Sequence, residues 1–191
     1  MFRRDLLAGL VAGMLALPAL AAEDGPGPNL VIEVGGDTQG TIVVDLLSDV
    51  APGHVERLTR LAESGAYDGV VFHRVLDGFM AQTGDVQFGK GGADMHRVGT
   101  GGSDMPDLDA EFSDLPFERG TVGMARSASP NSANSQFFIM FAPAPHLNGQ
   151  YTVVGRVIGG MDVVDSIKRG SQTANGAVLD PDRMVKVVVE R

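Results

Sequence analysis

The sequence of 191 residues contains no cysteine and no tryptophan. Without cysteine, the chain cannot form disulfide bonds, use a thiolate nucleophile or bind zinc through cysteine ligands. A chain without thiols suits an oxidising compartment, where a free thiol is a liability. The four histidines, at positions 54, 73, 96 and 146, lack metal-ligand spacing, so we expect no metal and interpret His54 and His96 as surface residues.

Positive charge is also scarce, because the chain has 15 lysines and arginines but 24 aspartates and glutamates, which gives a net charge of −9. Non-specific binding of nucleic acid depends on neutralising phosphates, so this balance argues against such a partner. No Gly-x-Ser-x-Gly motif supports a serine hydrolase. The glycine-rich segment 99–102 lacks the Lys-Ser/Thr pair of a phosphate-binding loop.

No hydrophobic run is long enough to predict a membrane span. Residues 6–20 are apolar but too short to cross a bilayer. They follow Arg3 and Arg4 and precede Ala19-Leu20-Ala21, a pattern typical of a secretory signal peptide over residues 1–21. The paired arginines also fit a twin-arginine signal, so the Sec and twin-arginine export routes both stay open. We expect a flexible leader over residues 22–29 and a single monomeric domain over residues 30–191.

Short runs with β propensity fill the remaining sequence. Helical periodicity is limited to residues 52–64, which begin at Pro52, and residues 161–169, which lie between glycines. The long segment 90–118 is interpreted as an ordered loop whose charges face solvent. Many short strands, two distant helices and 26 glycines favour a barrel over βαβ units. The predicted strands cover residues 30–34, 40–46, 70–75, 79–83, 121–126, 136–141, 152–157 and 185–190.

Residues 72–88 place one permanent cation, Arg74, among large apolar side chains. A guanidinium in such surroundings is costly unless a partner or a function requires it. A structural ion pair with Asp77 or Asp85 is one interpretation, and a catalytic role is another. Phe137 and Phe138 are consecutive in a predicted strand, so one should face the core and the other the opposite side.

Five short blocks follow one another along the chain. They are Phe-His-Arg at 72–74, Gly-Thr-Gly-Gly at 99–102, Gly-Met-Ala-Arg at 123–126, Ser-Gln-Phe-Phe-Ile at 135–139 and Leu-Asn-Gly-Gln at 147–150. Each block alone is weak, but the ordered set resembles the cyclophilin family of peptidyl-prolyl cis-trans isomerases over residues 30–191. The spacing is most similar to that of bacterial periplasmic cyclophilins. The resemblance implies a closed eight-stranded antiparallel β-barrel capped by two α-helices, with an active-site groove on its outer face.

The resemblance also implies roles for individual residues. Arg74 matches the catalytic arginine of the family, and Gln82 matches the glutamine that orients it. At Arg126 we expect the backbone, rather than the side chain, to contact the substrate. Where many eukaryotic members carry tryptophan this chain has His146, which implies weak cyclosporin binding, and where they carry histidine it has Tyr151. The implied substrate-binding residues are His73, Phe79, Met80, Ala125, Arg126, Gln136, Phe138, His146, Leu147 and Tyr151.

The sequence is therefore interpreted as an exported, periplasmic prolyl isomerase that needs no cofactor. Its expected substrates are proline-containing segments of exported proteins during folding, where prolyl isomerisation can be the slow step. A chaperone or assembly factor that binds proline peptides in the same groove without turnover is the main alternative. A purely structural protein on a cyclophilin scaffold is a third possibility.

Overall fold

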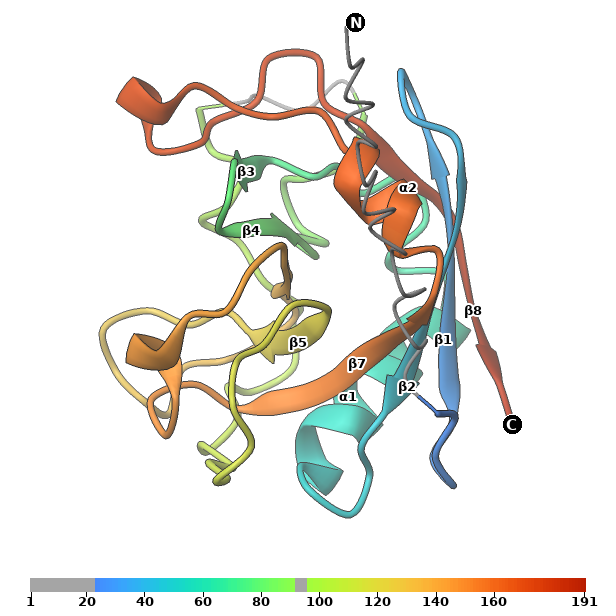
Figure 1. Ribbon diagram of the computed structural model, residues 1–191, viewed down its shortest axis with the longest axis vertical. Coiled ribbons are helices and arrows are strands. Elements are labelled where there is room, and N and C mark those ends of the chain that lie inside the picture. The colour runs from blue at the N-terminus through green and yellow to red at the C-terminus, as the bar shows by residue number, and fades with distance from the viewer. Residues whose placement is uncertain (1–22, 92–95) are drawn as a thin grey trace, which may run out of the picture.

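The computed structural model describes residues 23–91 and 96–191 (Figure 1), so the expected signal peptide lies outside the described residues. Eight strands form one antiparallel sheet in the order β3-β4-β6-β5-β7-β2-β1-β8. No helix among the described residues is long and apolar enough to cross a membrane. The strands are β1 (Asn29–Gly35), β2 (Gly40–Leu46), β3 (Arg74–Leu76), β4 (Met80–Thr83), β5 (Thr121–Met124), β6 (Phe137–Met140), β7 (Val153–Gly159) and β8 (Arg183–Glu190).

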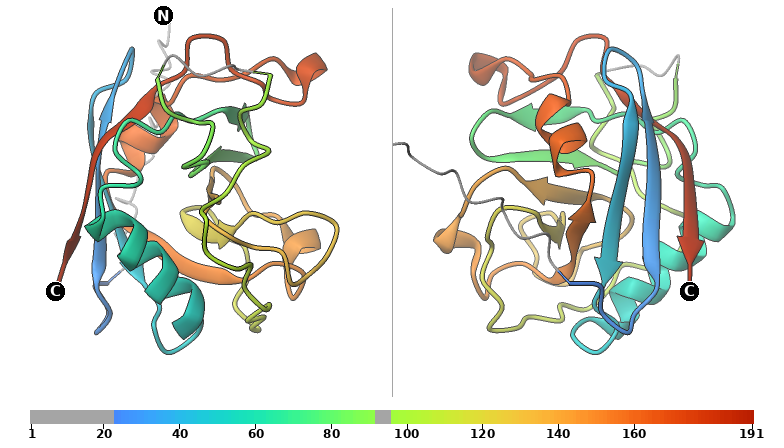
Figure 2. Two further views of the ribbon diagram at one scale, coloured as in Figure 1. Left: turned by 180° about the vertical axis from the view of Figure 1, so that it is seen from behind. Right: turned by 45° about the vertical axis from the view of Figure 1, so that its right-hand side comes forward.

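The sheet curls around the core as an open half-barrel, with β1, β2 and β8 on one side and β3 to β6 on the other (Figures 1 and 2). Its edge strands, β3 and β8, are not paired with each other over the described residues. The gap is bridged by an isolated pairing of Val71 with Arg183 and by a hydrogen bond from Phe72 N to Asp182 O. The predicted antiparallel architecture is therefore confirmed, whereas complete closure into a barrel is not.

Alternating side chains explain how the first two strands and β8 pack. Leu30, Ile32 and Val34 of β1 are buried. In β8 this alternation is interrupted, because Val187 is buried while Val185 is 45% exposed. A register shift opposite Glu33 and Val34 leaves Val185 as the extra residue of a β-bulge, which turns its side chain outward.

The two predicted helices are present, and both end earlier than predicted. Helix α1 (Pro52–Glu63) begins at the predicted proline and packs its apolar face inward. Helix α2 (Met161–Ser166) begins after Gly160, whose φ is 75°, and ends three residues earlier than expected. The main chain is extended at Ile167, and Asp182 Oδ2 accepts the Lys168 N–H at 2.9 Å, which diverts the chain from the helix.

The start of α1 is capped from the long loop by Glu111. Its two carboxylate oxygens accept the N–H groups of Gly53 and His54 at 3.1 and 3.0 Å, and its Oε2 also bonds His54 Nδ1. The interpretation of His54 as a surface residue is therefore wrong, because its side chain is fully buried. Burial alone would raise the pKa of Glu111, but the hydrogen bonds from His54 and Gly53 lower it overall.

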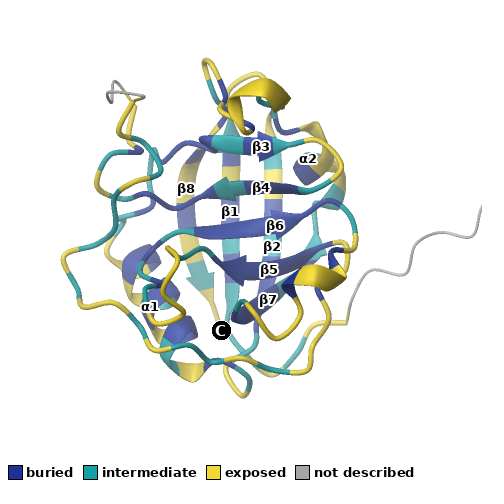
Figure 3. Cartoon of the chain, turned by 90° about the vertical axis from the view of Figure 1, so that its left-hand side faces the viewer, coloured by how far each residue is buried: buried dark blue, intermediate teal, exposed yellow. Residues whose placement is uncertain are grey.

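Two apolar clusters lie on opposite faces of the curled sheet. The larger cluster is the interior, where Phe137 packs edge-on against Tyr67. The smaller cluster lies on the outer face of β4, β5 and β6 and includes Phe138. Figure 3 shows these strands side by side, with the buried residues of β6 forming their centre. The expectation that Phe137 and Phe138 face opposite sides is confirmed, and the outer cluster provides an apolar floor for a site.

Candidate active site

Arg74 lies at the start of β3, directly opposite Gln82 on β4. Its Nη1 donates to Gln82 Oε1 at 3.1 Å. Neither carboxylate considered as a structural partner holds it, because Asp77 pairs with Arg169 and Asp85 accepts main-chain N–H groups. No salt bridge joins Arg74 to any carboxylate of the described residues. Burial lowers the pKa of Arg74, but an arginine stays charged at neutral pH. The side chain is thus a charged donor without an ionic partner.

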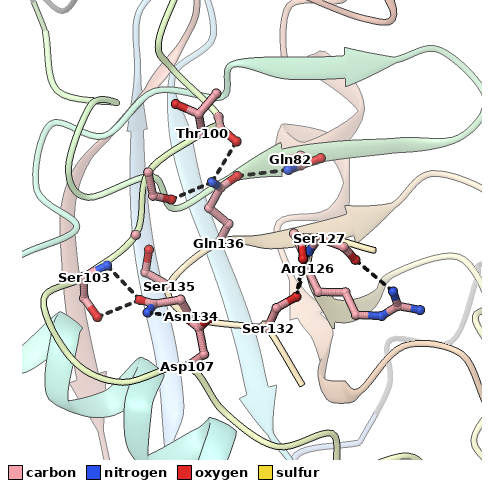
Figure 4. Close-up of a pocket in the computed structure, with 14 residues that line it drawn as sticks. Gln82, Thr100, Ser103, Asp107, Arg126, Ser127, Ser132, Asn134, Ser135 and Gln136 are labelled. Atoms are coloured by element: carbon pink, nitrogen blue, oxygen red, sulfur yellow. Dashed lines mark hydrogen bonds between the residues drawn. The ribbon is translucent and has the colours of Figure 1, made fainter. Parts of the chain in front are cut away.

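Gln82 is itself held by a second glutamine. Gln82 Nε2 donates to Gln136 Oε1 at 3.0 Å, and Gln136 Nε2 donates to the carbonyls of Gly99 and Gly101 at 3.0 and 2.8 Å (Figure 4). Both amide groups therefore have a fixed orientation, because swapping oxygen and nitrogen in either would break the chain of hydrogen bonds. We call the series of hydrogen bonds from Arg74 through Gln82 and Gln136 to the glycine-rich segment the glutamine relay. The orientation of Arg74 depends on this relay.

The glycine-rich segment that ends the relay is anchored by Asp85, which is fully buried. Asp85 Oδ2 accepts the N–H groups of Gly99 and Gly101 at 2.7 and 3.0 Å, and its Oδ1 accepts those of Gln87 and Phe88. The amides of Gly99 and Gly101 are therefore occupied by a carboxylate. This agrees with the prediction that the segment is not a phosphate-binding loop.

Beside Arg74 lies the outer apolar cluster, which contains several of the residues implied to bind substrate. Met80, Phe138 and Leu147 form its buried centre, and Phe79 and Tyr151 pack at its edge. Phe117 stacks on Phe138 with ring centroids 5.7 Å apart, and Tyr151 meets Phe138 edge-on at 5.8 Å. The exposed His146, which follows Pro145 in a short 3-10 helix, stacks on Phe79.

Arg126 shapes the far wall of the site with its side chain. Its guanidinium donates to the carbonyls of Gln150, Ser127 and Ala128 and lies over the Tyr151 ring at 4.4 Å. These contacts occupy most of its donors, so the side chain fixes local structure. Its backbone, beside Ala125, remains the expected contact for a substrate.

A polar hollow of about 470 Å³ continues from the glutamine relay along the surface (Figure 4). Asn134 organises its floor, since its Oδ1 accepts from the N–H and hydroxyl of Ser103 and its Nδ2 donates to Asp107 Oδ1. Ala125 and Arg126 line the boundary of this hollow. An extended peptide lying across Ala125 would therefore meet an apolar surface on one side and a polar hollow on the other.

His73 is next to Arg74 in sequence but does not enter the relay. It is 7% exposed, and neither ring nitrogen has a hydrogen-bond partner among the described residues. Burial lowers its pKa to about 4, so the imidazole is neutral at physiological pH. Its ring packs against Gly99, where a Cβ atom would lie 2.9 Å from it. These contacts indicate a packing role rather than proton transfer.

Comparison with known proteins decides the family. Residues 30–189 match the family described as cyclophilin type peptidyl-prolyl cis-trans isomerase/CLD. A probable peptidyl-prolyl cis-trans isomerase of Brucella suis is 55% identical over 192 aligned residues, which cover 99% of this chain and 97% of the relative. The chain belongs to the cyclophilin family. As a cyclophilin, it is a peptidyl-prolyl cis-trans isomerase, an enzyme whose substrates are proline-containing peptides.

Solved cyclophilins share the fold. A cyclophilin of Hirschia baltica aligns with a TM-score of 0.68 and 25% identity, covering 86% of this chain and 74% of that one. A Cryptosporidium parvum cyclophilin, solved in the presence of the dipeptide Ala-Pro, aligns with a TM-score of 0.71 and 24% identity, covering 85% and 99%. The open, curled sheet with two helices is therefore a cyclophilin architecture.

In this cyclophilin most of the predicted site residues fall into two adjoining groups, while His73 and Arg126 lie outside both. Arg74, Gln82 and Gln136 form the glutamine relay, whereas the predicted apolar residues form the outer apolar cluster. Sequence reasoning missed Asn175, which bonds Arg74 from the far side of the cyclophilin site. The only local signal was the Asn175-Gly176 dipeptide, which indicates a turn but not its neighbour.

Proposed function

We propose that Arg74 is the catalytic donor of this isomerase and that the outer apolar cluster holds the substrate proline. The observation that carries the proposal is the setting of Arg74. It is charged, it lacks an ionic partner, and Gln82 fixes it beside Met80 at the edge of the cluster. A cation so placed faces the position of a bound proline ring.

The chemistry of the X-Pro bond explains why such a donor accelerates isomerisation. The barrier to rotation, about 18–20 kcal/mol, comes from resonance between the amide nitrogen and the carbonyl. When the bond is twisted at the transition state, this resonance is lost and the lone pair localises on the nitrogen. An N–H of Arg74 directed at that nitrogen binds the transition state more strongly than either ground state, which lowers the barrier.

One donor does not account for the whole effect. A rate increase of about 10⁵ corresponds to a barrier lower by about 7 kcal/mol, and one electrostatic contact in a dry site supplies about 3–4 kcal/mol. The remainder is assigned to the proline clamp, in which Phe79, Met80, Phe138 and Leu147 hold the ring while the other side of the bond rotates. Backbone groups of Ala125 and Arg126 would bind the extended peptide in the manner of an added strand.

The biological setting that we propose is the folding of exported proteins in the periplasm. It is supported by the basic, apolar and small-residue pattern of residues 1–21. Cell fractionation of the native host, with N-terminal sequencing of the mature protein, tests this part. Recovery of a processed protein from the periplasm supports it, whereas an unprocessed cytoplasmic protein contradicts it.

The mechanism is tested by following isomerisation of a short Ala-Pro peptide with the wild type and with Arg74→Ala. Loss of one electrostatic contact should lower turnover by a factor on the order of 10²–10³ while the thermal unfolding curve stays unchanged. Unchanged turnover in a folded variant would exclude Arg74 as the donor. If Arg74→Ala lost turnover but still bound unfolded clients, the groove would also serve the alternative role of a peptide-binding chaperone.

A further inference from the structure

Arg74 is held from a second side by Asn175, which lies 101 positions later in the chain. Arg74 Nη2 donates to Asn175 Oδ1 at 3.1 Å, and Arg74 Nε donates to the main-chain carbonyl of Asn175 at the same distance. Gln82 accepts from Nη1 on the opposite side. We propose that Asn175 is a positioning residue that sets the direction of the Arg74 guanidinium. This inference rests on the catalytic role proposed above for Arg74.

The hydrogen bonds of Arg74 leave few donors for a substrate. A guanidinium has five N–H donors in one plane. Among the described residues, Asn175 accepts two of them and Gln82 accepts a third, while Met80 Sδ lies 3.9 Å from Nη1. Because the group is planar and rigid, fixing Nε and both Nη atoms also fixes where the remaining N–H groups point. Those N–H groups are the ones that can reach a prolyl nitrogen.

The backbone at this position favours asparagine. Asn175 follows the 3-10 helix η2 (Gln172–Ala174) with φ 53° and ψ 36°, in the left-handed region. Most L residues avoid this region, whereas asparagine and glycine tolerate it. Glycine would keep the turn but has no side-chain acceptor. Position 175 requires a left-handed backbone and a side-chain oxygen directed at Arg74 Nη2, and asparagine satisfies both requirements.

The loop that carries Asn175 is fixed without its side chain. Gly170 N donates to Val75 O, and Val75 N donates to Gly176 O, both at 2.8 Å, so the loop is bonded to β3 beside Arg74. Removal of the Asn175 amide should leave this backbone in place. Such a change should therefore alter the orientation of the Arg74 guanidinium and leave the fold intact.

The test compares kcat and KM for an Ala-Pro peptide among full-length variants. Asn175→Gly keeps the turn and removes Oδ1, and we expect kcat to fall about tenfold, the loss of one hydrogen bond to a charged group, with KM within twofold. Asn175→Ala should lose the same kcat but also melt at a lower temperature, because alanine disfavours positive φ. Gln172→Ala, an exposed change on the same turn, is the matched control and should retain wild-type kcat and KM.

A double-mutant cycle separates positioning from a general structural effect. In an Arg74→Lys background there is no guanidinium to orient, so adding Asn175→Gly should lower kcat less than twofold further. A full tenfold loss in that background, or wild-type kcat in Asn175→Gly alone, would overturn the inference. Arg74→Ala is measured in parallel. If Arg74→Ala keeps wild-type turnover, the proposed catalytic role of Arg74 fails, and this inference fails with it. If Arg74→Ala loses turnover as expected but the Asn175 variants keep wild-type kcat, only this inference is refuted.

Discussion

Gln82 uses both ends of its side-chain amide at once, because its oxygen accepts from Arg74 and its nitrogen donates to Gln136. Gln82 lies on β4, and Gln136 immediately precedes the neighbouring strand β6. Gln136 in turn bonds the carbonyls of Gly99 and Gly101. The orientation of the Arg74 guanidinium therefore depends on the loop that carries Gly99 and Gly101, and the buried Asp85 fixes the position of that loop.

Breaking this relay should reduce catalysis in a graded way. Gln82→Leu removes the acceptor of Arg74 Nη1, and kcat should fall about tenfold, as expected for a hydrogen bond to a charged group. Gln136→Leu leaves the contact between Arg74 and Gln82 intact, so its loss should be smaller, about threefold. Peptide isomerisation assays give both values, with the exposed Gln150→Ala as control. Equal losses in the two variants would argue against a relay.

Phe138 should matter to both binding and stability. It is 5% exposed, and its ring packs between Phe117 and Tyr151. Phe138→Ala should raise KM for proline peptides and lower the free energy of unfolding by about 3 kcal/mol, the usual cost of emptying a large buried site. Phe112, which is 43% exposed, provides the control, since Phe112→Ala should change stability by less than about 0.5 kcal/mol. An unchanged KM in Phe138→Ala would remove this ring from the proline clamp.

The cap formed by Glu111 predicts a stability effect far from the catalytic residues. Glu111→Ala leaves the N–H groups of Gly53 and His54 and the buried His54 ring without their acceptor. The free energy of unfolding in urea should fall by about 2 kcal/mol. Asp109→Ala, an exposed change on the same loop, should have little effect. A melting curve for Glu111→Ala that overlays the wild type would refute the capping role.

The low pKa of His73 predicts a loss of stability in mild acid. The ordinary pKa of 6.5 applies to the unfolded chain, and burial lowers the folded value to about 4. Between these values the unfolded state binds more protons, so stability is complete above pH 6.5 and falls as pH decreases towards 4. The free energy of unfolding should be about 2 kcal/mol lower at pH 5 than at pH 7 because of this group.

His73→Phe supplies the control for this pH effect, since its stability should depend less on pH over that window. Turnover of the wild type should stay nearly constant between pH 6 and 8, because isomerisation moves no proton and His73 is neutral throughout. A steep inflection of kcat near pH 6.5 would implicate a histidine in the chemistry.

Local sequence signals predicted most elements of the fold. Pro52 marked the start of α1, and the consecutive Phe137 and Phe138 were correctly divided between the two faces of one strand. The signals failed where distant contacts decide the conformation. The helix ending at Ser166 is cut short by Asp182, and the bulge at Val185 exists only because of its register with β1.

The candidate site shows the same division. The family resemblance assigned roles to Arg74 and Gln82, and the structure places the two residues opposite each other in one hairpin. Asn175 could not be found in this way, since its contact with Arg74 spans 101 positions and forms only when the chain folds back along β3. His54 was misplaced for a related reason, as its partner Glu111 lies 57 positions away.

The separation between Arg74 and Asn175 has a consequence for how the protein is made. A ribosome must add 101 residues after Arg74 before Asn175 exists, which at 5–20 residues per second takes roughly 5–20 s. Until then the nascent chain contains Arg74 but not the second set of acceptors for its guanidinium. A chain interrupted before residue 175 would also lack β8, which pairs with β1 and adds Met184 and Val187 to the core. Full activity is therefore a property of nearly complete chains, and premature products of this gene should be poor catalysts.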